Sequence, residues 1–118
     1  MGEIPAFAVE VYHPNRGKTV VAVSGELDLG NAEKLRGPLI KAVSSISHEC
    51  VVLDLSDCGF LDSSGLRLLL SAQRRAQATG SSLRIAGSGP AVVRVIELTA
   101  VDKFLRLFPD VPAALGAA

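Results

Sequence analysis

Residues 50–70, CVVLDLSDCGFLDSSGLRLLL, set the architecture of the chain. Residues 50–56 form a nearly continuous apolar run, which is typical of a strand buried on both faces of a sheet. The stretch DSSG at 62–65 then precedes leucines at helical spacing. Asp and Ser are favoured helix N-caps, because their side chains accept hydrogen bonds from the free N–H groups of the first turn. The segment therefore predicts a buried strand followed by a helix that starts at DSSG.

The helix after DSSG is expected to be amphipathic and to end at Gly80, because glycine tolerates the left-handed conformation that closes many helices. Three arginines on it should point mostly outward. They form either a docking patch or a solvated face, and the sequence leaves both readings open. The arginines are Arg67, Arg74 and Arg75, and the residues expected to point inward are Leu66, Leu69, Leu70, Gln73 and Ala76.

Upstream, Phe7, Val9 and Val11 alternate with other residues as in a half-buried strand, and TVVAVSG at 19–25 reads as a second strand. The turn HPNRGK between them predicts a hairpin. A helix should follow, capped by Gly30 or Asn31. Pro38 conflicts with an unbroken helix, so we expect a kink there or a main helix that begins at Pro38. The apolar positions of this helix are Leu35, Leu39, Ala42, Val43 and Ile46.

Downstream, SLRIAG at 82–87 reads as a strand and PAVVRVIELTA at 90–100 as a helix with proline in its first turn. FLRLF at 104–108 is a candidate edge strand, and VPAALGAA at 111–118 a terminal helical turn. This order predicts one α/β domain over residues 1–118. Its mixed sheet should have four to five strands, with helices mainly on one face. DSSG should lie at the carboxyl edge of the parallel strands, where such sheets usually place function.

Composition excludes several functional classes. Twelve basic and twelve acidic residues balance in a chain of 118, so no overall field attracts nucleic acid. We expect no membrane span and no secretory signal, and hence a cytoplasmic protein. Cys50 and Cys58 are expected to be buried thiols, since neither a disulfide framework nor a zinc site can be built from them. No metal and no cofactor is expected.

Enzyme chemistry has little support in the residues. His13 and His48 are the only histidines, both expected in solvated loops, and neither belongs to a nucleophile–base arrangement. Asp54 lies near the end of a strand as in a response-regulator receiver, but the acidic pair and the lysine that a receiver needs are missing, so Asp54 should cap or orient local backbone. GSGPAVV at 87–93 matches a dinucleotide fingerprint only partly, because Val92 stands where a third Gly or Ala is needed.

Three segments together carry a family resemblance: GELD at 25–28, VVLDLSDCGFLDSSGL at 51–66 and GPAVVRVIELTAVDKFLRL at 89–107. In order and spacing they resemble the anti-sigma factor antagonists, bacterial proteins built on a single STAS domain. The resemblance runs from the first strand to about residue 110, and the domain core should span about 5–110.

The resemblance implies a phosphorylation switch. In the family, the unphosphorylated antagonist binds an anti-sigma factor that is itself an ATP-using serine kinase, and so frees a sigma factor. The kinase phosphorylates the first serine of the motif, the partners separate, and a phosphatase resets the cycle. By position the acceptor here is Ser63, with Ser64 as the alternative, and Asp28 matches an acidic residue close to the acceptor.

The expected partner-binding surface surrounds this serine. A phosphate of about −1.5 to −2 charges would join carboxylates of Asp28, Asp57 and Asp62 and repel a partner matched to the neutral hydroxyl. We expect release without refolding. The expected partner-binding residues are Asp28, Phe60, Leu61, Asp62, Ser63, Ser64, Gly65 and Arg67.

Two other functions remain compatible with the sequence. One is a STAS interaction subunit that never cycles through phosphate, such as part of a lipid-transport ABC complex or a signalling assembly. The other is a small nucleotide-binding phosphotransfer protein that uses the turn at Gly87 and Gly89. A monomer or a weak dimer is expected, because the edge of the first strand could pair or stay free.

Overall fold

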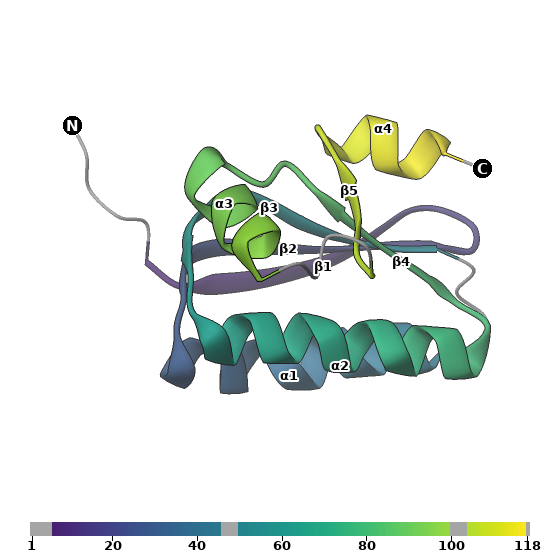
Figure 1. Ribbon diagram of the computed structural model, residues 1–118. Helices are drawn as coiled ribbons and strands as arrows, with labels where there is room; N and C mark the ends of the chain where they lie inside the picture. The colour runs from purple at the N-terminus through teal and green to yellow at the C-terminus, as the bar shows by residue number, and fades with distance from the viewer. Residues whose placement is uncertain (1–5, 46–49, 100–103, 118) are drawn as a thin grey trace.

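The computed structural model of the protein describes residues 6–45, 50–99 and 104–117, and it confirms the mixed α/β fold (Figure 1). Five strands form one sheet in the order β1-β2-β3-β4-β5, with β1 antiparallel to β2 and the other pairs parallel. The elements are β1 (Ala8–Asn15), β2 (Lys18–Leu27), α1 (Leu29–Ser44), β3 (Cys50–Leu61), α2 (Ser63–Thr79), β4 (Ser82–Ala86), α3 (Pro90–Leu98), β5 (Arg106–Phe108) and α4 (Val111–Gly116).

The sheet separates two apolar layers. Helices α1 and α2 lie side by side against one face, and α4 lies on the opposite side (Figure 1). Alternation along the central strand β3 supplies both layers, since successive side chains of a strand point to opposite faces. Val51, Leu53 and Leu55 belong to the large core under α1 and α2, whereas Val52 belongs to the small core that includes Ala114 of α4. Strand β3 is therefore buried on both faces, as its apolar sequence predicts.

Strand β3 is longer than the sequence indicated, because it continues through DCGFL to Leu61 instead of ending at residue 56. Its parallel pairing with β2 shifts twice, between Ala22/Ser24 and between Gly25/Glu26. Each shift leaves one more residue on β3 than on β2, which is the pattern of a β-bulge. At the first bulge the carboxylate of Asp54 accepts the N–H of Ser56 (3.0 Å), so Asp54 orients local backbone as expected. With these two bulges, β3 continues for five residues beyond Ser56 before α2 begins.

Helix α1 runs without interruption from Leu29 to Ser44 with Pro38 inside it. The alternative of a main helix beginning at Pro38 is therefore wrong, while the kink stays a prediction. The cap is Asp28 rather than Gly30 or Asn31, because its carboxylate accepts the N–H of Asn31 (3.0 Å). Ile46 and His48 lie outside the described residues.

The C-terminal elements follow the sequence prediction closely. Helix α3 begins at Pro90, and α2 ends at Gly80 in the left-handed conformation with φ 78°. Helix α4 is anchored to the sheet by Arg84, whose guanidinium donates to the carbonyl oxygens of Ala114 (2.5 Å) and Ala117 (2.9 Å). Arg84 is only 7% exposed, so these bonds form where water has little access.

Candidate functional site

Two helices begin side by side at the carboxyl edge of β2 and β3. Leu27 pairs with Leu61 at the ends of these strands, and each is followed by an aspartate that caps the next helix. The N–H of Asp62 donates to the carbonyl oxygen of Leu27 (3.2 Å), which ties the second helix start to the first strand. GELD at 25–28 and GFLD at 59–62 thus build the same local structure twice, and Ser63 and Leu29 are the first residues of the two helices.

The cap of α2 leaves the hydroxyl of Ser63 free. Asp62 Oδ1 accepts the N–H groups of Ser64 (2.9 Å) and Gly65 (3.0 Å). Ser63 is exposed, and within the described residues its side chain has no hydrogen-bond partner, whereas Ser64 is half-buried. Of the two serines, Ser63 is therefore the more exposed to solvent, on a backbone that the cap holds in place.

Gly65 brings the first turn of α2 against the ends of β2 and β3. A Cβ at this position would lie 2.8 Å from the carbonyl oxygen of Leu27 and 2.5 Å from Cδ1 of Leu61. Real Cβ atoms do not approach backbone oxygens this closely, so a larger residue would push the helix start away. The glycine of DSSG thus sets where Ser63 lies.

The neighbouring start of α1 is fixed by a different residue. Asp28 accepts the N–H of Asn31, and the Asn31 amide donates to the carbonyl oxygen of Glu26 (2.8 Å). Asp28 is half-buried in this arrangement. Its carboxylate therefore stands at the start of α1, the helix that begins beside the one that carries Ser63.

The predicted partner-binding residues differ in how exposed their side chains are. Phe60 is 44% exposed, and Ser63 and Arg67 are also exposed, so these side chains can touch a partner. Leu61 and Gly65 are buried, so they can only position the site. Sequence reasoning missed Leu29, which is 68% exposed at the first position of α1. The repeated sequence G-x-L-D could have indicated Leu29, because Leu29 follows the first copy as Ser63 follows the second.

Asp57, Arg74 and Arg75 do not gather at Ser63. Asp57 lines a shallow pocket with Glu10 and Asp54, on residues of β1, β2 and β3, instead of joining Asp28 and Asp62. The three arginines of α2 make no single patch, because Arg75 donates to the Ser44 hydroxyl of α1 (2.9 Å) and Arg74 lines a pocket further along the helix.

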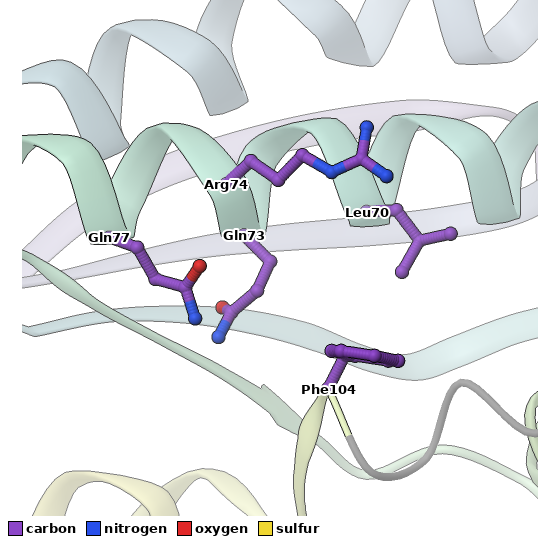
Figure 2. Close-up of a pocket in the computed structure, with 5 residues that line it drawn as sticks. All are labelled: Leu70, Gln73, Arg74, Gln77 and Phe104. Atoms are coloured by element: carbon purple, nitrogen blue, oxygen red, sulfur yellow. The ribbon is translucent and has the colours of Figure 1, made fainter.

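That pocket, shown in Figure 2, has a volume of about 220 Å³ and lies beside the middle of α2. The Phe104 ring faces Leu70, and the buried Oε1 atom of Gln73 has no hydrogen-bond partner. No residue around Ser63 lines the pocket, so it is separate from the candidate site. Its lining residues are Leu70, Gln73, Arg74, Gln77 and Phe104.

The remaining polar candidates are accounted for by local contacts. His13 lies in strand β1, not in a turn as expected, and its Nδ1 atom is 3.0 Å from the Thr19 hydroxyl. The thiol of Cys58 donates to the carbonyl oxygen of Phe60 (3.2 Å), and burial raises its pKa. Gly87 has φ 73°, and a Cβ there would collide with Ser56. The close packing against Ser56 is thus enough to explain why residue 87 is a glycine.

Two negative findings concern only the part of the chain that the structure describes. No group of three or more His, Cys, Asp or Glu side chains is placed to hold a metal ion. No helix combines the length and the apolar character that a membrane span requires.

Comparisons with known proteins agree with this geometry. The STAS-domain family model matches residues 8–114. An anti-sigma F factor antagonist of Paenibacillus polymyxa is 28% identical over 107 residues, which cover 91% of each chain. The anti-sigma-F factor antagonist RsfB of Mycobacterium tuberculosis is 31% identical over 103 residues, covering 86% of this chain and 81% of RsfB.

A solved structure shows the same likeness in three dimensions. The crystal structure of an anti-sigma factor antagonist from Mycobacterium paratuberculosis superimposes with a TM-score of 0.82 at 34% identity, covering 93% of this chain and 92% of that one. Fold, motif and relatives therefore agree that the chain belongs to the STAS-domain family, among the anti-sigma factor antagonists.

Proposed function

We propose that the protein binds an anti-sigma factor serine kinase while Ser63 is unphosphorylated, so that a sigma factor is released, and that phosphorylation of Ser63 ends the complex. The kinase transfers the γ-phosphoryl group of ATP to Ser63 Oγ, the hydroxyl loses its proton, and ADP leaves. A phosphatase hydrolyses the phosphoserine and restores binding. In this cycle the protein is a substrate and a ligand, not an enzyme, and it works in the cytoplasm, where kinase and sigma factor are found.

The observation that carries the proposal is the free, exposed hydroxyl of Ser63 at the first position of a capped helix. A kinase must reach the acceptor oxygen, and Ser63 is exposed whereas Ser64 is half-buried. Asp62 keeps the amides of Ser64 and Gly65 bonded, so the acceptor sits on an ordered backbone. These facts favour Ser63 over Ser64 as the acceptor.

The charge of the phosphate accounts for release of the partner. A helix N-terminus tolerates an added anion because the helix dipole favours negative charge there, so phosphorylation should leave α2 folded. The same phosphate stands beside the caps Asp28 and Asp62. A partner that covers Leu29 and Phe60 would have to desolvate this charge, which makes the complex unfavourable without any rearrangement of the fold.

The test compares phosphorylation of wild type, Ser63→Ala and Ser64→Ala in host lysate supplied with ATP, by intact-mass and phosphopeptide analysis. We expect one phosphate on wild type and on Ser64→Ala, and none on Ser63→Ala. Ser71→Ala, a substitution further along α2, is the matched control and should keep the phosphate. Binding to the purified kinase should be constitutive for Ser63→Ala in the presence of ATP.

Two outcomes would contradict the proposal. Full phosphorylation of Ser63→Ala with none on Ser64→Ala would move the acceptor to Ser64. No phosphate on any variant, in a lysate with demonstrated kinase activity, would favour a STAS subunit that does not cycle, and Ser63→Ala would then serve as bait for a transport ATPase. The monomer or weak dimer expected from the free edge of β1 can be measured on the same samples by light scattering.

A further inference from the structure

Arg67 lies one helical turn after Ser63 and on the same face of α2. Side chains four residues apart on a helix are neighbours, with Cβ atoms about 5–6 Å apart. Long side chains of a helix lean toward its N-terminus. Figure 2 shows this for the same helix, where Arg74 extends back toward Leu70. An Arg67 side chain with the same lean would reach the turn that carries Ser63.

Arg67 has no competing partner among the residues that the structure describes. Arg67 is exposed, and it makes no hydrogen bond or ion pair with them, whereas Arg36 of α1 pairs with Glu33 (3.6 Å). The two carboxylates at this edge already accept backbone N–H groups, Asp28 from Asn31 and Asp62 from Ser64 and Gly65. Within residues 63–70, the first two turns of α2, Arg67 is the only charged side chain.

We propose that Arg67 is the internal counter-ion of phosphorylated Ser63. This pairing rests on the proposed function in one respect, that Ser63 is the residue that accepts the phosphate. A phosphoserine has three strong acceptor oxygens, and the planar guanidinium fork is suited to bind two of them. The pair forms within one helix and needs no movement of the sheet.

The pairing gives the switch a second component. In the unphosphorylated protein Arg67 is an exposed cation one turn from Ser63, and a partner that covers this surface should place a carboxylate opposite it. After phosphoryl transfer the guanidinium is held by the phosphate. The partner then meets an added anion and also loses the cation that its carboxylate faced.

Other charges at this edge do not provide the same pairing. Carboxylates stand at the ends of β2 and at both helix starts, and they raise the pKa of a nearby phosphate instead of lowering it. The cations on the neighbouring helices have other partners or lie on α3. The carboxylates are those of Glu26, Asp28 and Asp62, and the cations are Lys34 over the Phe7 ring, Arg36 paired with Glu33, and Arg94 on the second turn of α3.

The test is a phosphorus NMR titration of protein that carries phosphoserine at position 63, introduced during translation. A nearby cation favours the dianion, so Arg67 lowers the second pKa of the phosphate. Arg67→Gln should raise this pKa by about 0.2–0.4 unit, the size expected of an exposed pair one turn apart. Arg67→Lys should restore part of the shift, and salt at about 0.5 M should reduce it.

Arg74→Gln is the matched control, because Arg74 is an exposed arginine on the same helix two turns further from the phosphate. Equal shifts in Arg67→Gln and Arg74→Gln, or no shift in Arg67→Gln, would overturn the proposal. The phosphoserine is installed without a kinase, so such a result leaves Ser63 as the acceptor. Conversely, a lysate that does not phosphorylate Ser63 refutes the proposed function and leaves this titration unaffected.

Discussion

Replacing Gly65 by alanine tests whether the close approach of α2 to the strand ends positions the switch. The added Cβ would lie 2.8 Å from the Leu27 carbonyl oxygen and 2.5 Å from Leu61 Cδ1. Leu61 Cδ1 can move with its side chain, but the Leu27 oxygen is backbone and accepts the N–H of Asp62. The helix start must therefore shift, and the Asp62 cap shifts with it.

The magnitude follows from two opposing terms. Overpacking of this kind costs about 1–3 kcal/mol, and the better helix propensity of alanine offsets up to about 1 kcal/mol. We expect Gly65→Ala to lower the free energy of unfolding by about 1–2 kcal/mol. For a chain of this size that corresponds to a fall in Tm of roughly 4–8 °C. Phosphorylation of Ser63 should slow as well, because the acceptor moves with the helix start.

Gly30→Ala provides the matched control at the start of α1. A Cβ at residue 30 would meet only Asp28 Oδ1, at an ordinary 3.9 Å, so this variant should be neutral or slightly stabilised. The assay is urea unfolding followed by circular dichroism, with phosphorylation rates measured on the same samples. A Gly65→Ala protein as stable as wild type, or an equal loss in Gly30→Ala, would show that the close approach does not constrain the helix start.

Three further substitutions test separate parts of the structure. Asp62→Ala removes a cap that accepts two N–H groups and should cost about 0.5–2 kcal/mol in urea unfolding, whereas Asp62→Asn should retain most of that stability. Arg84→Met removes the bonds that anchor α4 and should cost about 1.5–3 kcal/mol, with the α4 amides exchanging hydrogen well before the central strands. The raised pKa of Cys58 means less thiolate in the folded protein, so in a Cys50→Ala background alkylation should be much slower than in urea. Stability should also fall as pH rises above about 8.5, because the unfolded thiol ionises first and the folded one only at higher pH.

The order of elements could be read from the sequence because it rests on local patterns. Alternation, helical spacing and the preference of Asp for N-caps involve residues a few positions apart, and the DSSG cap uses only residues 62–65. The length of β3 could not be read in this way. Asp57 and Gly59 are poor strand residues, and they stay in β3 because two bulges keep the strand paired with β2. The first bulge also determines which side of the sheet Asp57 faces, so its distance from Ser63 was not predictable.

Pro38 illustrates the same limit in a helix. A proline inside a helix costs about 3 kcal/mol, so the sequence favours a break. The structure keeps α1 whole because residues on both sides of the proline belong to one buried face: Leu35, Leu39 and Val43 are fully buried. A break would expose part of this face, and burying one large apolar side chain is worth about 1.5–3 kcal/mol. The tertiary core therefore outweighs the local preference.

On the proposed function, the two copies of G-x-L-D explain why the switch would belong to α2 and not to α1. Both helices start with an aspartate cap after paired leucines, but Asn31 fixes the first turn of α1 through Glu26, whereas Gly65 lets the first turn of α2 touch the strand ends directly. The first residue is Leu29 in one copy and Ser63 in the other, and both are exposed. One helix start therefore offers an apolar contact and the other a modifiable hydroxyl. A partner that spans both would bind through Leu29 and sense the state of Ser63, so Leu29→Ala should weaken partner binding both in the otherwise wild-type protein and in Ser63→Ala.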